Sequence, residues 1–299
     1  MLFLAISILF TSALYLIFKA FDKYKVESFP VIIINYFFST IISLAVWGND
    51  IPAHLYANPP SLYIYSSILG LAFVFIFILL NKTTAILGVS GATIVSRMSL
   101  VISATYSIVL LGDKVNILKA SGIILACVSI YFTVFQKKNE LPQEEDFIKK
   151  EKNILIPLLA FFGTGGIDVS LKYFEQNFIT ENTINDFITC IYAGAFIGGL
   201  VWTFISRSEL KALFKLKNIL WGLLLAVCNF LSLYLFLFAL IKAKIQGSVL
   251  FPVNSVGIVA VSTVLSVIIF REKINRQNAI GLALAAGAIL LISLSINFS

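Results

Sequence analysis

Two charged residues, Arg97 and Asp168, lie deep inside long apolar segments of the sequence. A charged side chain at the centre of a membrane-spanning helix costs about 2.5–3.5 kcal/mol to insert, so each needs a partner or a function. The guanidinium of Arg97 can bind a carboxylate or a phosphate through paired hydrogen bonds. The alternative is a structural contact with Asp168 or with neighbouring carbonyl groups. Asp168 can likewise bind and release a proton, or serve only in a structural ion pair.

Other polar residues in the apolar segments are candidates for binding a solute. Lys19 and Lys172 lie near segment ends, where a lysine either extends its ammonium group to the membrane surface or lines a path for a solute. Lys172 can also pair with Asp168, one helical turn earlier. Asparagines join helices by hydrogen bonds or contact a solute, and Pro252 lacks a backbone donor and is a candidate hinge. The candidate binding residues are Lys19, Asn35, Arg97, Lys172, Asn229 and Asn254, with Asp168 as the candidate coupling group.

Residues for catalysis or metal binding do not converge in the sequence. The single histidine, His54, lies in a predicted loop, and each of the three cysteines lies in an apolar segment. No Gly-x-x-x-x-Gly-Lys-Ser/Thr loop is present to bind nucleotide phosphates. We therefore expect no enzymatic activity, no metal site and no cofactor. An intramembrane enzyme and a membrane scaffold remain the alternatives to a binding or transport function.

The segments that position these residues are those of an integral membrane protein. Of the 299 residues, 59% are hydrophobic and 12% are charged, whereas soluble domains average about 45–50% and 25%. This composition excludes soluble enzymes and nucleic-acid-binding proteins, and it makes the lipid bilayer the surroundings of the chain. A span needs about 20 apolar residues. Ten such segments occur, near residues 2–21, 29–47, 62–84, 88–111, 115–135, 153–174, 185–205, 218–241, 245–270 and 276–296.

A charged segment divides five predicted spans from five. We predict a first five-helix unit at residues 1–135, a charged cytoplasmic linker at 136–152 and a second five-helix unit at 153–299. Lysine and arginine residues are concentrated in the loops after the first, third, fifth, seventh and ninth spans. The positive-inside rule places these loops in the cytoplasm and both termini outside.

The two halves of the chain resemble each other in sequence. Residues 88–130 align without a gap with residues 247–289, and residues 11–22 align with residues 164–175. Because each unit has an odd number of spans, the second copy must enter the membrane from the opposite side. Such inverted repeats are typical of secondary transporters. Among the identical or similar pairs are Gly88/Gly247, Asp113/Glu272, Lys114/Lys273, Asn116/Asn275 and Gly122/Gly281.

Each half also contains a tight turn followed by a glycine-bearing last helix. The turns read Leu-Leu-Gly-Asp-Lys-Val at residues 110–115 and Ile-Phe-Arg-Glu-Lys-Ile at residues 269–274. In these motifs the chain resembles the EamA-type, ten-helix proteins of the drug/metabolite transporter superfamily. Pro252 matches a proline that this family carries in the fourth helix of a unit, whereas the first half has Thr93 there. The resemblance covers nearly the whole chain and implies an all-α membrane fold of ten helices in two inverted five-helix repeats.

We therefore expect a secondary transporter that moves a small polar metabolite by alternating access of the two repeats. Basic residues outnumber acidic ones in and beside the spans, which favours an anionic or zwitterionic substrate such as an organic acid or an amino acid. The family resemblance implies a multi-pass protein of the cell inner (plasma) membrane. Because both repeats lie on one chain, we expect the protein to function as a monomer.

Overall fold

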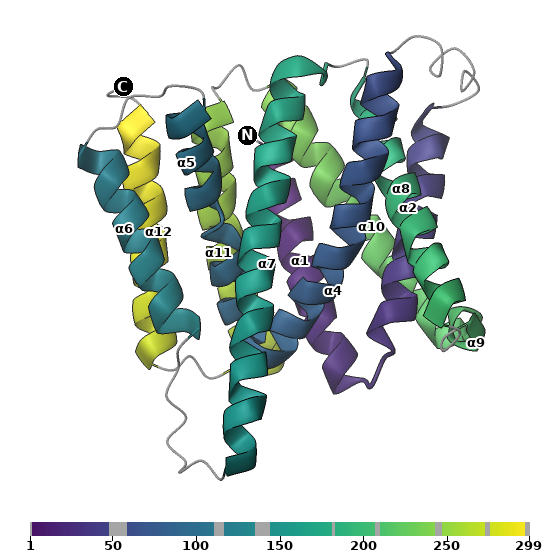
Figure 1. The fold of residues 1–299 in the computed structure, drawn as a ribbon, viewed down its shortest axis with the longest axis horizontal. Helices are drawn as coiled ribbons and strands as arrows, with labels where there is room; N and C mark the ends of the chain where they lie inside the picture. The colour runs from purple at the N-terminus through teal and green to yellow at the C-terminus, as the bar shows by residue number, and fades with distance from the viewer. Residues whose placement is uncertain are drawn as a thin grey trace. The chain divides into compact units, whose positions relative to one another are not determined.

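The residues that the computed structural model describes lie almost entirely in α-helices (Figure 1). It describes residues 2–47, 59–110, 117–134, 144–180, 183–206, 210–242, 247–272 and 276–296, and these contain no β-strand. Helices are expected because a lipid bilayer offers no partner to backbone groups, and a helix satisfies those groups internally. The helices are α1 (Leu2–Lys23), α2 (Ser28–Trp47), α4 (Pro60–Arg97), α5 (Leu100–Leu110), α6 (Ile117–Val134), α7 (Glu144–Asn177), α8 (Ile184–Ser206), α9 (Leu210–Leu213), α10 (Leu216–Lys242), α11 (Gly247–Phe270) and α12 (Arg276–Ile296).

The described helices are those of a multi-pass membrane protein. Seven helical segments among the described residues are long and apolar enough to cross a bilayer, and shorter apolar helices occur at Ile117–Ser129 and Ala279–Leu291. One of the seven, Pro60–Ser103, extends over 44 residues and includes much of two spans that the sequence predicted separately. The helical membrane class is therefore confirmed, and the number of ten spans stays a prediction.

The largest departure from the predicted helices lies between residues 88 and 111. The sequence predicted one helix there, with Arg97 well inside it. The structure instead ends α4 at Arg97, places Met98 and Ser99 in a turn, and begins α5 at Leu100. Serine hydroxyls that bond to nearby carbonyls compete with helical hydrogen bonds, and the Ser99 hydroxyl donates to the carbonyl of Ser96 at 2.6 Å. Arg97 therefore lies at the end of a helix and not within the continuous helix that the sequence predicted, while remaining inside the apolar segment Pro60–Ser103.

Helix α7 begins earlier than the sequence predicted. We expected a start near residue 153, after the charged segment, whereas the helix begins at Glu144. Glutamate and lysine have high helix propensity, and acidic residues in the first turn interact favourably with the helix dipole. Residues 144–152 of the predicted linker therefore belong to α7.

The chain divides into two compact units, and each unit takes residues from both halves of the sequence. Unit 1 comprises Met1–Ile78 and Ser170–Lys244, and unit 2 comprises Leu79–Val169 and Ile245–Ser299. The boundaries fall inside α4 and α7. The five-helix units predicted at residues 1–135 and 153–299 are defined by similarity along the sequence, whereas these two units are defined by contacts in space. The division into five-helix units stays a prediction.

The core of unit 1 is built around α2 and α10. Helix α10 packs against α1 and α2, and α2 also packs against α8. Aromatic rings fill the interior: the ring of Phe18 lies 5.5 Å from that of Phe77, which in turn lies 5.5 Å from Tyr36. Helix α4 approaches α8 closely, because a Cβ atom at Gly194 would lie 2.3 Å from the carbonyl oxygen of Ser67. Small residues permit this contact between helices, as is common in membrane proteins.

The core of unit 2 brings α6, α11 and α12 together. Helix α12 packs against α6 and α11, and the Ser129 hydroxyl of α6 donates to the carbonyl of Gly281 in α12 at 2.7 Å. Apolar side chains from α4, α6, α7, α11 and α12 surround this contact, among them Ile94, Ala126, Phe161, Val259 and Ala285.

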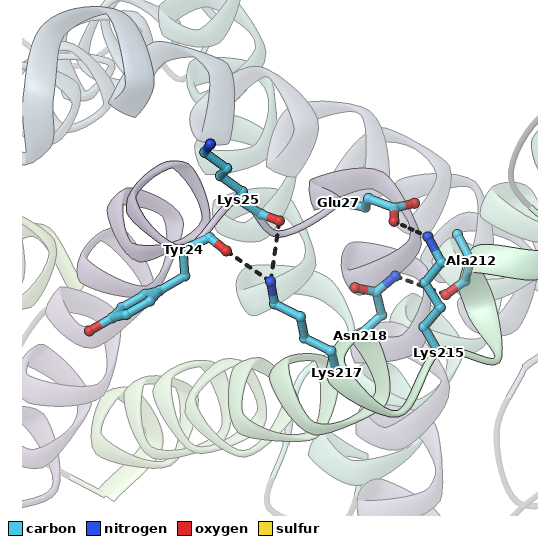
Figure 2. Close-up of polar contacts among 7 residues, drawn as sticks. All are labelled: Tyr24, Lys25, Glu27, Ala212, Lys215, Lys217 and Asn218. Atoms are coloured by element: carbon cyan, nitrogen blue, oxygen red, sulfur yellow. Dashed lines mark hydrogen bonds and ion pairs between the residues drawn. The ribbon is translucent and has the colours of Figure 1, made fainter.

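The turn between α1 and α2 is closed by a side chain from α10. Lys25 adopts the left-handed conformation with a φ of 50°. The amide of Val26 donates to the carbonyl of Phe21 at 2.8 Å, and that of Lys25 to Asp22 at 3.3 Å, which is the Schellman pattern of a helix end. Figure 2 shows the ammonium of Lys217 donating to the carbonyls of Tyr24 and Lys25, at 2.8 and 3.3 Å. A cation at this position also suits the negative end of the α1 dipole.

We expect Lys25→Gly to raise the free energy of unfolding by about 0.5–1 kcal/mol, because glycine adopts a positive φ without steric cost. The matched control is Lys23→Gly, inside the last turn of α1, which should lower it by about 1 kcal/mol. Thermal unfolding of both variants in detergent measures the difference. A lower melting temperature for Lys25→Gly would contradict the strain assigned to this turn.

Candidate functional site

The two charged residues predicted inside the spans lie together in unit 2. Arg97, at the end of α4, is half-buried, and Asp168 of α7 is half-buried as well. The carboxylate of Asp168 is attracted by the Arg97 guanidinium, and its Oδ2 accepts a hydrogen bond from the Ser99 hydroxyl at 2.6 Å. A cation, an anion and a hydroxyl therefore meet at the break between α4 and α5. We define Arg97, Ser99 and Asp168 as the charged cluster.

Two acceptor oxygens in the charged cluster compete for the single hydroxyl hydrogen of Ser99. The Ser99 oxygen lies 2.6 Å from Asp168 Oδ2 and also 2.6 Å from the carbonyl oxygen of Ser96. A serine hydroxyl has one hydrogen to donate. If a proton binds Asp168, the carboxyl group can donate to Ser99 while Ser99 donates to the Ser96 carbonyl. The cluster can thus hold one more proton without moving a heavy atom.

The segment that carries Arg97 is fixed at its other end by Glu272. Gly88 interrupts α4 with a φ of 76° and a ψ of 177°, and the amide of Val89 then donates to Glu272 Oε1 at 3.1 Å. A carboxylate at a helix N-terminus satisfies an unpaired amide and suits the dipole. Glu272 thereby gives the Val89 amide a hydrogen-bond acceptor that α4 does not supply at the kink.

Hydrogen bonds between side chains join the same segment to α11. The Ser262 hydroxyl donates to Thr93 Oγ1 at 3.2 Å, and the Thr263 hydroxyl donates to Ser90 Oγ at 3.3 Å. Ser90 and Thr93 are therefore attached to α11, and Thr93 lies one helical turn before Arg97.

Asn254 of α11 is the predicted binding residue with an open acceptor. It is 6% exposed, and its Oδ1 has no hydrogen-bond partner among the described residues. A buried polar atom without a partner costs about 1–3 kcal/mol, so the oxygen suits a donor from a water molecule or a solute. Pro252, two residues earlier, lies in α11, and the hinge predicted for it stays a prediction.

In unit 1 the structure brings Asn35 and Asn229 together. The Asn229 amide donates to Asn35 Oδ1 at 3.3 Å, and the Tyr192 hydroxyl donates to the Asn229 carbonyl at 3.1 Å. The pair links α2 to α10, and both residues are buried. Structural hydrogen bonding, the alternative to solute binding for these asparagines, is therefore present. Next to them the buried hydroxyl of Tyr36 has no partner among the described residues.

The remaining predicted residues, Lys19 and Lys172, also belong to unit 1 and are half-buried. Lys19 lies in the last part of α1, and Lys172 lies one helical turn after Asp168 in α7. Arg97, Asp168 and Asn254 belong to unit 2. With the candidate hinge Pro252, which belongs to unit 2, the predicted site residues are thus divided equally between the two units, four in each.

Sequence reasoning missed a fully buried acid. Asp186 in the first turn of α8 is 0% exposed, and the sequence analysis did not identify it as a candidate. The signal was present, because Thr183 and Asp186 have the Thr-x-x-Asp spacing typical of a helix start. Among the described residues, no three His, Cys, Asp or Glu side chains group as a metal site would require.

We expect Gly88→Ala to lower the free energy of unfolding by about 1–3 kcal/mol, because its Cβ would lie 1.7 Å from Glu272 Oε1 and its φ would be strained. The matched control is Gly166→Ala in α7, where an added Cβ meets no described heavy atom within 4 Å. That change should leave stability unchanged or raise it. Thermal unfolding in detergent compares the two, and equal melting temperatures would contradict the role of Gly88.

Comparison with known proteins supports the fold. No family model matches the sequence. An uncharacterized protein of Haemophilus influenzae is 21% identical over 229 residues, which cover 74% of this chain and 72% of that protein. A solved crystal structure matches 99% of this chain and 97% of its own, with a TM-score of 0.62 and 13% sequence identity. This chain is therefore similar in fold to a protein of known structure.

Proposed function

We propose that the protein is a secondary transporter that moves a small polar metabolite across a membrane by alternating access. The observation that carries the proposal is the charged cluster. Helix α4 ends at Arg97 inside a long apolar segment, and Asp168 of α7 attracts Arg97 there. Both charges face an insertion cost unless they pair or bind something polar. Interrupted helices with polar groups at the break are a recurring construction of transporter binding sites.

The proposed architecture is ten spans in two inverted repeats, as in the EamA-type transporters that the sequence resembles. The helix starts support this arrangement. Gly88 and Gly247 are equivalent in the aligned repeats; α11 begins at Gly247, and a helical segment resumes after the kink at Gly88. The turn after α11 also supports it, because Arg271 has a φ of 52° and its equivalent in the first repeat is Gly112. Glycine is the residue type that best tolerates this backbone conformation.

The proposed substrate carries a carboxylate and a hydrogen-bond donor, as an amino acid does. The Arg97 guanidinium can bind the carboxylate in competition with Asp168. The unpaired acceptor of Asn254 suits an ammonium or hydroxyl group. An organic acid satisfies the first of these requirements, and an amino acid satisfies both.

The hydrogen count of the charged cluster supports proton coupling at Asp168. A proton on Asp168 completes the chain of hydrogen bonds through Ser99 to the Ser96 carbonyl. The same proton weakens the attraction between Asp168 and Arg97, which leaves the guanidinium for a substrate carboxylate. Proton binding and anion binding are then coupled through one residue. The proposed setting is the cell inner membrane, with both termini outside and the chain acting as a monomer.

The test of transport is uptake by liposomes that contain the purified full-length chain. Amino acids and organic acids are offered singly, with empty liposomes as background. Arg97→Gln should reduce uptake of the transported solute about 10- to 100-fold, since a hydrogen bond to a charged group is worth about 1.5–3 kcal/mol. Arg97→Lys keeps the charge but not the paired hydrogen-bond geometry, so its uptake should lie between that of the wild type and that of Arg97→Gln.

The matched control is Arg276→Gln, which removes an exposed arginine at the start of α12 and should change uptake less than twofold. Elution as a single species in size-exclusion chromatography verifies folding of each variant. Normal uptake by Arg97→Gln contradicts the assignment of Arg97 to the substrate. Absence of uptake of every solute by the wild type favours the alternatives, an intramembrane enzyme or a membrane scaffold.

For coupling, Asp168→Asn should abolish the stimulation of uptake by an inward proton gradient while retaining exchange of internal for external substrate. Asparagine cannot release a proton but keeps hydrogen-bonding capacity toward Ser99. Net uptake and exchange are measured in the same liposomes at two external pH values. Persistent stimulation of the variant by the gradient assigns coupling to another group.

A further inference from the structure

We propose that the α1–α2 turn, α9 and the start of α10 form a binding surface for the head group of an anionic phospholipid. This surface carries two acids, Asp22 and Glu27, and more than twice as many lysines. All seven side chains are exposed. We call the lysines of this surface the basic rim; they are Lys23, Lys25, Lys211, Lys215 and Lys217.

Internal contacts occupy part of the basic rim. Lys215 forms an ion pair with Glu27, and Lys217 donates to the carbonyls that end α1 (Figure 2). Figure 2 also shows the Lys25 side chain extending away from Lys217, while the Lys25 carbonyl faces the Lys217 ammonium. The inner lysines therefore hold the turn in place, and Lys25 and Lys211 carry the positive charge outward.

Apolar side chains interleave with the basic rim. Phe214 is 80% exposed, Leu216 is 70% exposed and Leu220 is 58% exposed, and they alternate along the chain with Lys215 and Lys217. Tyr24 is 54% exposed, and its ring lies 5.7 Å from that of Trp221. Tyrosine and tryptophan favour the boundary between hydrocarbon and water. A segment that combines exposed apolar residues with lysines lies at that same boundary.

These two properties identify the partner as a lipid and not a soluble anion. The head group of phosphatidylglycerol carries one negative phosphodiester charge, and its acyl chains cover apolar surface. A soluble phosphate would satisfy the lysines but leave Phe214 and Leu216 in water. Clusters of lysines beside a span attract anionic lipids in this way.

The test measures binding of phosphatidylglycerol to the detergent-solubilised full-length chain, with phosphatidylcholine as the neutral reference and glycerol phosphate as the soluble anion. Lipid is titrated into mixed micelles, and the rise in melting temperature gives an apparent Kd. We expect wild-type protein to prefer phosphatidylglycerol. The double variant Lys25→Gln/Lys211→Gln should weaken that binding about 10- to 30-fold and leave the response to phosphatidylcholine unchanged.

Two further variants make the result specific. Lys242→Gln removes an exposed lysine from the other end of α10 and should change binding less than twofold. Glu27→Gln removes the acid that pairs with Lys215 and should tighten binding of phosphatidylglycerol. This gain also tests the proposal if the double variant does not fold. Equal binding of both lipids by the wild type, no gain with Glu27→Gln, or equal protection by glycerol phosphate overturns the proposal.

Discussion

Inside a bilayer no water is available to backbone groups, so each amide or carbonyl that a helix leaves open needs a partner from the protein. A charged side chain supplies such a partner at two places where a helix is interrupted or ends. At the kink in α4 the partner of the Val89 amide is Glu272, which lies beyond the end of α11. At the end of α1 the partner of the Tyr24 and Lys25 carbonyls is Lys217, at the start of α10. In both places a charged side chain matches the sign of the helix dipole that it meets.

The groups of the charged cluster also need partners from the protein, and here the partners are side chains. Arg97 and Asp168 attract each other, and Ser99 links the carboxylate to the Ser96 carbonyl. Inside a membrane protein a pair of opposite charges gains little net stability, because desolvation offsets most of the attraction. The pair can also be exchanged: when a solute carboxylate binds Arg97 and a proton binds Asp168 together, neither group keeps an uncompensated charge. Residues that only stabilised the fold could have been apolar at lower cost, which favours a functional reading of the cluster.

Sequence reasoning succeeded where a property is summed over many residues. Apolar segments predicted the membrane class, and most helix ends lie within a few residues of their predicted positions, as for α2, α10 and α12. It failed at the break after Arg97, where the Ser99 hydroxyl bonds to the Ser96 carbonyl inside a segment predicted as one helix. The interruption at Gly88 agrees with the predicted start of a span at residue 88, but its partner Glu272 lies too far along the chain to give a local pattern. The pairing of Asn35 with Asn229 likewise depends on how α2 meets α10. Asp186 was missed because its complete burial depends on the packing of neighbouring helices, which no local sequence pattern reveals.

Glu272 links the stability of the fold to the position of the charged cluster. It follows Arg271, whose left-handed backbone turns the chain at the end of α11, and its carboxylate fills the space that a side chain at Gly88 would take. The segment between Gly88 and Arg97 is therefore held by a turn that belongs to the opposite half of the sequence. A change in the tilt of α11 would move this turn, and the Val89 amide would have to follow it or lose its partner. In the proposed transporter, this contact makes the Arg97 segment and α11 move as one element, which carries the binding group with the helix that holds Asn254.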